Sequence, residues 1–133
     1  MTISSLATSD RLDILEVLTR AEMAATARDA DAYVALFTDD AVLEGAQGVH
    51  MGKEALREAV GPIWASEGSA TFHLLLNAVI DRVNTDCDEA IATSILLIVR
   101  QGTPLQVLHV SEITQQLKRV DGYWKIARRS VKA

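Results

Sequence analysis

The residues with the clearest chemical potential are a histidine in an apolar β-type segment and a glutamate on the apolar face of a predicted helix. His73 lies in the run Thr71–Val83, and Glu22 falls on the helical stripe of Leu18 and Ala25. A carboxylate on an apolar face should have a raised pKa unless it is paired, and an imidazole is a natural partner. We predict that Glu22 and His73 form an acid/base pair that moves a proton on a bound molecule.

A second group of residues is predicted to bind the substrate around this pair. Strand side chains alternate, so Asn77 shares a face with His73, and His109 and Gln115 share a face with Ser111. A hydroxyl, imidazole or amide at these positions could donate a hydrogen bond to a developing oxyanion. The predicted substrate-binding residues are Tyr33, Trp64, Asn77, Arg100, His109, Ser111 and Gln115.

Each candidate also has a purely structural interpretation. His73 could be a core histidine bonded to a backbone carbonyl or to Tyr33, and Glu22 could reach solvent or pair with Arg28 or a basic strand residue. His50, in a glycine-rich loop, is expected to be exposed rather than catalytic. The basic residues of the last two strands are interpreted as a solvated face: Lys118, Arg119, Lys125, Arg128, Arg129 and Lys132.

Length, charge and cysteine content exclude several classes of protein. A chain of 133 residues is long enough for one domain but not for two. The net charge of −5 argues against nucleic-acid binding, and Cys87 as the single cysteine allows no internal disulfide. The sequence shows no metal-ligand motif, cofactor fingerprint, signal peptide or membrane span, so we expect a cytoplasmic protein without metal or cofactor.

Apolar spacing predicts three helices and one short strand in the first half of the chain. The first helix covers about residues 10–28, and a short second helix runs through residues 33–37. Residues 41–44 form the strand, and a loop or open hairpin follows. The third helix begins at Lys53 and is expected to kink or restart at Pro62.

The second half is predicted to be a four-stranded antiparallel meander, which makes the fold class α+β. The four strands are Thr71–Val83, Ala90–Gln101, Leu105–Val120 and Tyr123–Val131. The first two are apolar on both faces, whereas a sheet with one solvated face should alternate. We therefore expect the helices to cover one face of the sheet and a second subunit to cover the other, giving a homodimer.

Three stretches carry a resemblance to a known family: residues 29–42, 73–80 and 119–126. In this order they resemble the SnoaL-like branch of the nuclear transport factor two-like superfamily, whose fold is cystatin-like. The resemblance implies three N-terminal helices packed on a strongly curved antiparallel sheet, forming a cone with an internal pocket for a small hydrophobic molecule. Members include polyketide cyclases, ketosteroid isomerase and scytalone dehydratase, so the fold does not select a reaction.

The family's functional residues are only partly present. Two functional residues of scytalone dehydratase have a match here, its strand histidine in His73 and its pocket serine in Ser111. The other two do not, since its second histidine falls near Arg100 and its aspartate falls near Met23. The ketosteroid isomerase mechanism is excluded, because its base and two donors fall at Gly45, Ala21 and Gln115.

Two functions remain open at this point. One is a cofactor-free enzyme that moves a proton on a small hydrophobic substrate, as an isomerase, cyclase, dehydratase or hydrolase. The other is a non-catalytic domain that binds a hydrophobic ligand or acts as a dimeric interaction module. The enzyme needs His73 and Glu22 at an open cavity, whereas the interaction module needs neither.

Overall fold

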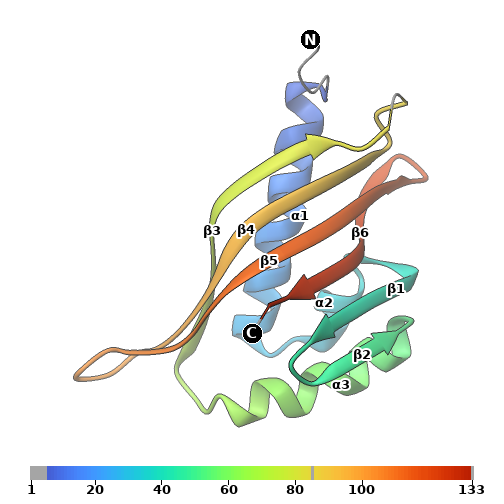
Figure 1. The fold of residues 1–133 in the computed structure, drawn as a ribbon. Helices are drawn as coiled ribbons and strands as arrows, with labels where there is room; N and C mark the ends of the chain where they lie inside the picture. The colour runs from blue at the N-terminus through green and yellow to red at the C-terminus, as the bar shows by residue number, and fades with distance from the viewer. Residues whose placement is uncertain (1–5, 85, 133) are drawn as a thin grey trace.

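The computed structural model describes residues 6–84 and 86–132, over which the chain forms three helices and six strands (Figure 1). The strands form one sheet in the order β2-β1-β6-β5-β4-β3. The predicted α+β class is confirmed. In chain order the elements are α1 (Thr8–Ala27), α2 (Ala30–Val34), β1 (Phe37–Gly45), β2 (Gly48–Met51), α3 (Lys53–Ser66), β3 (Thr71–Arg82), β4 (Glu89–Arg100), β5 (Gln106–Val120) and β6 (Tyr123–Val131).

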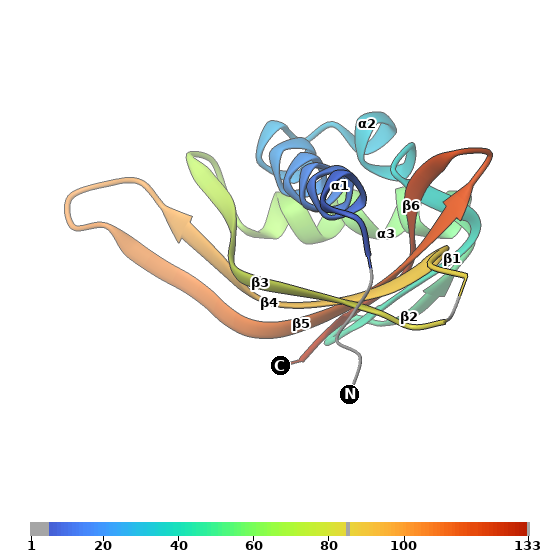
Figure 2. The ribbon, with the colours of Figure 1, turned by 90° about the horizontal axis from the view of Figure 1, so that it is seen from above.

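The three helices lie on the concave side of the curved sheet, which does not close on itself (Figure 2). Neighbouring strands are antiparallel except β1 and β6, which pair in parallel, so the prediction of a wholly antiparallel sheet is wrong at this pairing. Phe37 belongs to β1 and not to the second helix, because its strand pairing with the distant Ile126 overrides the local helical spacing. α3 continues through Pro62 to Ser66.

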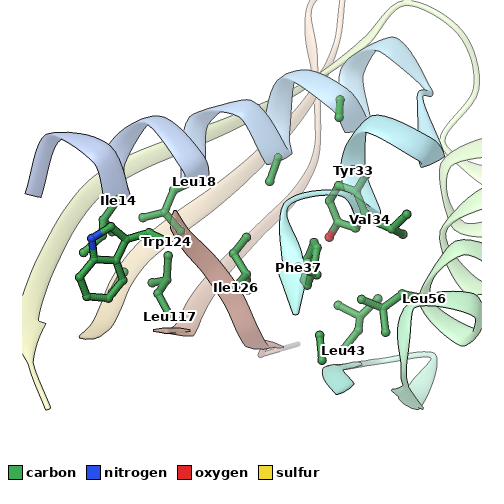
Figure 3. Close-up of a cluster of buried hydrophobic side chains, with 14 of the residues drawn as sticks. Ile14, Leu18, Tyr33, Val34, Phe37, Leu43, Leu56, Leu117, Trp124 and Ile126 are labelled. Atoms are coloured by element: carbon green, nitrogen blue, oxygen red, sulfur yellow. The ribbon is translucent and has the colours of Figure 1, made fainter. Parts of the chain in front are cut away.

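The core fills the space between the helices and the concave face (Figure 3). Ile14 and Leu18 of α1 pack toward Leu117 and Ile126 of the sheet, and all four side chains are fully buried. Burying one such side chain contributes about 1.5–3 kcal/mol. Trp124 completes this wall, and its indole Nε1 donates a hydrogen bond to Asp10 Oδ1 over 3.1 Å. This packing fixes α1 across the sheet.

Two bulges in the strands reverse which side chains face the helices. In β3 the pairing with β4 shifts between Leu76 and Val79, and Asn77 adopts a left-handed backbone with φ of 55°. In β6 the register skips one residue, since Leu117 pairs with Ile126 while Gln116 pairs with Arg128. Each extra residue moves the side chains beyond it to the opposite face.

The convex face is mostly apolar over β3, β4 and the first part of β5, becomes polar along β5 at Glu112, Thr114 and Gln116, and is covered by none of the described helices. Leu74, Leu97 and Val110 lie in one row across the three strands, with Val110 61% exposed. The prediction of apolar side chains on both faces was made for the segments 71–83 and 90–101, and it matches β3 and β4. No described helix is both long and apolar enough to span a membrane.

Candidate functional site

A cavity of about 430 Å³ lies between the concave face of the sheet, α3 and the β1–β2 hairpin. This volume is in the range of small-molecule sites, about 300–1,000 Å³. All three histidines of the chain line it. Ala25 is the single α1 residue among the described lining residues, and α3 supplies more of the wall. Its polar lining side chains include Tyr33, Glu44, His50, Glu67, His73, Arg100, His109 and Arg129.

Glu22 is buried behind the cavity wall as one partner of an ion pair. Its Oε2 accepts a hydrogen bond from Arg129 Nη1 at 2.5 Å, and its Oε1 lies 3.4 Å from Nη2. Burial alone would raise the pKa of Glu22, but the charge of Arg129 and hydrogen bonds from His73 and Arg129 outweigh it and lower the pKa to about 2. Glu22 does not line the cavity among the described residues, so it is placed to orient its neighbours rather than to touch a ligand.

Arg129 was expected on a solvated face, and the structure corrects this, because it is only 4% exposed. The bulge in β6 is the reason, since it turns Arg129 inward where regular alternation from Trp124 and Ile126 would have turned Arg128 inward. Arg129 lines the cavity, and its guanidinium carbon lies 6.0 Å from the centre of the Tyr33 ring.

His73 lies between two carboxylates. Its Nε2 is 2.8 Å from Glu67 Oε1, and its Nδ1 is 3.5 Å from Glu22 Oε1, at the limit of a hydrogen bond. Its backbone N–H donates to Thr26 Oγ1 over 2.9 Å, which ties β3 to the end of α1. Burial by itself would lower the pKa of His73, but hydrogen bonding to Glu22 and Glu67 and their negative charges raise it. The imidazole is therefore held toward its protonated form beside the cavity.

Glu67 is a cavity residue that the sequence analysis did not identify. It is the C-cap of α3, where a negative charge is disfavoured by the helix dipole unless cations compensate it. The cations are present, since Arg28 Nη1 donates to Glu67 Oε1 at 3.2 Å and Arg100 Nη2 donates to the Glu67 carbonyl at 2.6 Å. Its other carboxylate oxygen, Oε2, has no hydrogen-bond partner among the described residues. An acidic residue at a predicted helix end, next to Gly68, is the sequence signal for this position.

Of the residues predicted to bind a substrate, four line the cavity: Tyr33, Trp64, Arg100 and His109. The rings of Tyr33 and Trp64 meet edge to face with centroids 5.2 Å apart. Burial raises the pKa of the Tyr33 phenol to about 12, and no described residue makes a hydrogen bond to its hydroxyl. Tyr33 is therefore a neutral donor available to a ligand.

The remaining predicted residues lie elsewhere. Asn77 is exposed and outside the cavity, because the bulge in β3 breaks the alternation that linked it to His73. Ser111 and Gln115 are buried without lining the cavity, and the Ser111 hydroxyl is hydrogen-bonded to His109 Nε2. His50, expected in an exposed loop, is half-buried in β2 and faces the cavity. The described residues contain no group of three or more side chains placed to hold a metal ion.

The shifted pKa values of Glu22 and His73 predict how the stability of the protein depends on pH. The lowered pKa of Glu22 contributes stability that is complete above its unfolded value of 4.5 and is lost as the pH falls toward 2. The raised pKa of His73 contributes stability that is complete below its unfolded value of 6.5 and is lost as the pH rises through the folded value. We expect urea denaturation between pH 3 and pH 9 to give the highest free energy of unfolding between about pH 4.5 and 6.5.

The variant His73→Gln tests the contribution of the raised His73 pKa to the stability of the protein. It removes the titrating imidazole, so the decline in the free energy of unfolding above pH 6.5 should be shallower than in the wild type. Parallel profiles for the two proteins between pH 6 and pH 9 would contradict the assignment.

Comparisons with known proteins agree on the fold. The model of the SnoaL-like domain family matches residues 7–130. A protein of unknown function with a cystatin-like fold from Nostoc punctiforme is 28% identical, with a TM-score of 0.87 over 96% of this chain and 92% of that one. A protein of unknown function from Mycobacterium tuberculosis is 23% identical, with a TM-score of 0.82 over 94% and 76%. A nuclear transport factor two-like protein from Novosphingobium aromaticivorans is 22% identical, with a TM-score of 0.79 over 93% and 81%. A search of the curated proteins gave no match.

Proposed function

Because the chain belongs to the SnoaL-like domain family, we propose that its cavity binds a small, largely apolar molecule and moves a proton on it without a cofactor. The observation that carries the proposal is the Glu67–His73 pair, which joins a carboxylate and a raised-pKa imidazole at the cavity wall over 2.8 Å. The nuclear transport factor two-like fold includes cofactor-free isomerases and dehydratases, and acid/base groups at a cavity are what proton transfer requires.

The proposed catalytic pair is Glu67 and His73, whereas the sequence predicted Glu22 and His73. Glu67 Oε2 is the base, since Glu67 lines the cavity and its Oε1 is held by His73 and Arg28, while Oε2 has no hydrogen-bond partner among the described residues. The protonated His73 stabilises the carboxylate before transfer and supports return of the proton afterwards. Glu22 keeps Arg129 and His73 in position without touching the substrate.

Tyr33 is proposed to bind the oxygen on which negative charge develops. Removing a proton next to a carbonyl moves an electron pair onto the carbonyl oxygen, and a fixed neutral donor stabilises that oxygen. The Tyr33 hydroxyl stays protonated in the accessible pH range, because burial raises its pKa to about 12. Returning the proton to a different carbon would complete an isomerisation, with no atom gained or lost.

The test uses 2-tetralone, a bicyclic ketone with acidic protons next to its carbonyl. We expect the protein to accelerate exchange of its C1 protons for deuterium in D2O, followed by proton NMR. Exchange at the buffer rate would contradict the catalytic proposal.

A non-catalytic ligand-binding function is the second candidate, and one observation favours it. Glu22, Arg129, His73 and Glu67 neutralise one another within the fold, as a purely structural ion cluster would. Binding of 2-tetralone without exchange, measured by saturation-transfer NMR, is the result expected from this alternative.

We also propose that a second copy of the chain covers the convex face of the sheet. The row of Leu74, Leu97 and Val110 presents an apolar surface that can meet its own copy about a twofold axis. Figure 2 shows the convex side open, while the helices occupy the concave side.

The dimer is tested by sedimentation equilibrium at micromolar concentration. The wild type is expected at twice the mass of the chain, and Leu74→Lys at the monomer mass, because a buried lysine in the interface lacks a partner. Leu12→Lys, an equally apolar exposed position on α1, is the control and should remain dimeric. A monomeric wild type would refute the proposal.

A further inference from the structure

His50, on the β1–β2 hairpin, lines the cavity and has a buried polar atom for which the described part of the chain supplies no partner. The Nε2 atom of His50 is buried and has no hydrogen-bond partner among the described residues. In the register of the β1–β2 hairpin His50 pairs with Leu43, and both side chains line the cavity. A buried polar atom without a partner is costly, so a hydrogen bond from a ligand at this point would be favourable.

His50 lies at the opposite edge of the sheet from the proposed catalytic pair. β2 and β3 are the two edge strands in the order β2-β1-β6-β5-β4-β3, and His50 and His73 come from these two edges. Both side chains line one cavity, and the sheet that carries them is curved (Figure 2). The walls between them include Leu43, Leu96 and Ile98.

We infer that the ligand has an apolar body with a polar group at each of two ends, and that His50 binds the end farther from Glu67 and His73. This inference rests on the proposed binding function of the cavity and adds a chemical class, a cyclic or aromatic molecule with two separated oxygen functions. His50 accepts or donates one hydrogen bond to the second oxygen, depending on its tautomer. It is a specificity-determining residue and takes no part in the proton transfer.

The experiment compares three fluorescent probes that share one apolar body: naphthalene, 2-naphthol and 2,6-dihydroxynaphthalene. Fluorescence titration gives the dissociation constant of each with the wild type and the variants His50→Ala, His50→Gln and Val49→Ala. Val49 is the matched control, because it neighbours His50 in β2 and is 60% exposed. The readout is the ratio of the affinities of the diol and 2-naphthol within each protein.

In the wild type the diol is expected to bind about fivefold more tightly than 2-naphthol, as one net hydrogen bond provides. This advantage should disappear in His50→Ala, return in part in His50→Gln and persist in Val49→Ala. An advantage that persists in His50→Ala, or that is absent in the wild type, overturns the inference while 2-naphthol binding leaves the cavity proposal intact. If none of the probes binds, the cavity proposal fails and the inference fails with it.

Discussion

Replacing Arg129 by methionine is expected to lower the free energy of unfolding by about 3–5 kcal/mol, the usual cost of removing one partner of a buried ion pair. The Glu22 carboxylate, only 3% exposed, would lose the 2.5 Å hydrogen bond from Arg129 and would keep only the His73 imidazole, 3.5 Å away, as a cationic neighbour. Methionine keeps much of the length of the arginine stem, so the loss reports on charge more than on packing. Urea denaturation at pH 7 measures it.

Two further variants make this result specific to the buried pair. Arg128→Met changes the neighbouring arginine, which pairs with Glu44 at the surface and should unfold close to the wild-type midpoint. The double variant Glu22→Met with Arg129→Met removes both charges and should recover most of the lost stability, because neither partner is left alone. An Arg129→Met protein as stable as Arg128→Met would show that the pair is not the centre of this core.

Replacing Glu67 by glutamine is expected to reduce the catalysed exchange of 2-tetralone protons by about 10²–10⁴-fold, the range that a positioned general base contributes. The amide can still accept hydrogen bonds from His73 and Arg28 through its oxygen, so the end of α3 should remain in place. The same NMR assay measures the rate, with KM expected to stay near the wild-type value.

The control for this substitution is Glu16→Gln, which makes the same chemical change on the exposed face of α1. It should leave the exchange rate unchanged. If Glu67→Gln exchanges as fast as the wild type, the base is another group and the proposed role of Glu67 is wrong. Circular dichroism of both variants separates a loss of chemistry from a loss of fold.

Local sequence patterns predict where the helices and strands lie, but they do not predict which side chains of a strand face the core. Helical spacing located α1 and α3, and turn residues separated β3, β4, β5 and β6. Period-two alternation placed His73 correctly on the concave face but failed for Asn77, beyond the bulge of β3. The parallel pairing of β1 with β6 depends on residues some ninety positions apart and leaves no local signal.

The sequence predicted that Glu22 and His73 are neighbours, but it did not predict the ion pairs that each of them forms with other residues. His73 and Glu22 were expected to be neighbours, and they lie 3.5 Å apart. Two other residues decide their charge states. Arg129 was placed on a solvated face, because the bulge that turns it inward was not predicted. Glu67 was not identified, because it reaches His73 from the end of another helix. Pairing across elements is a property of the assembled fold that one strand or helix does not encode alone.

The bulge at Asn77 also affects how readily the edge of the sheet could pair with a strand of another molecule. β3 is an edge strand, and its outer row of amide and carbonyl groups offers a template on which a foreign strand could add. A left-handed residue in the middle of that strand breaks the row into two short pieces and increases the local twist. With Asn77 in this conformation, the apolar β3 edge presents no long continuous row on which a foreign strand could add.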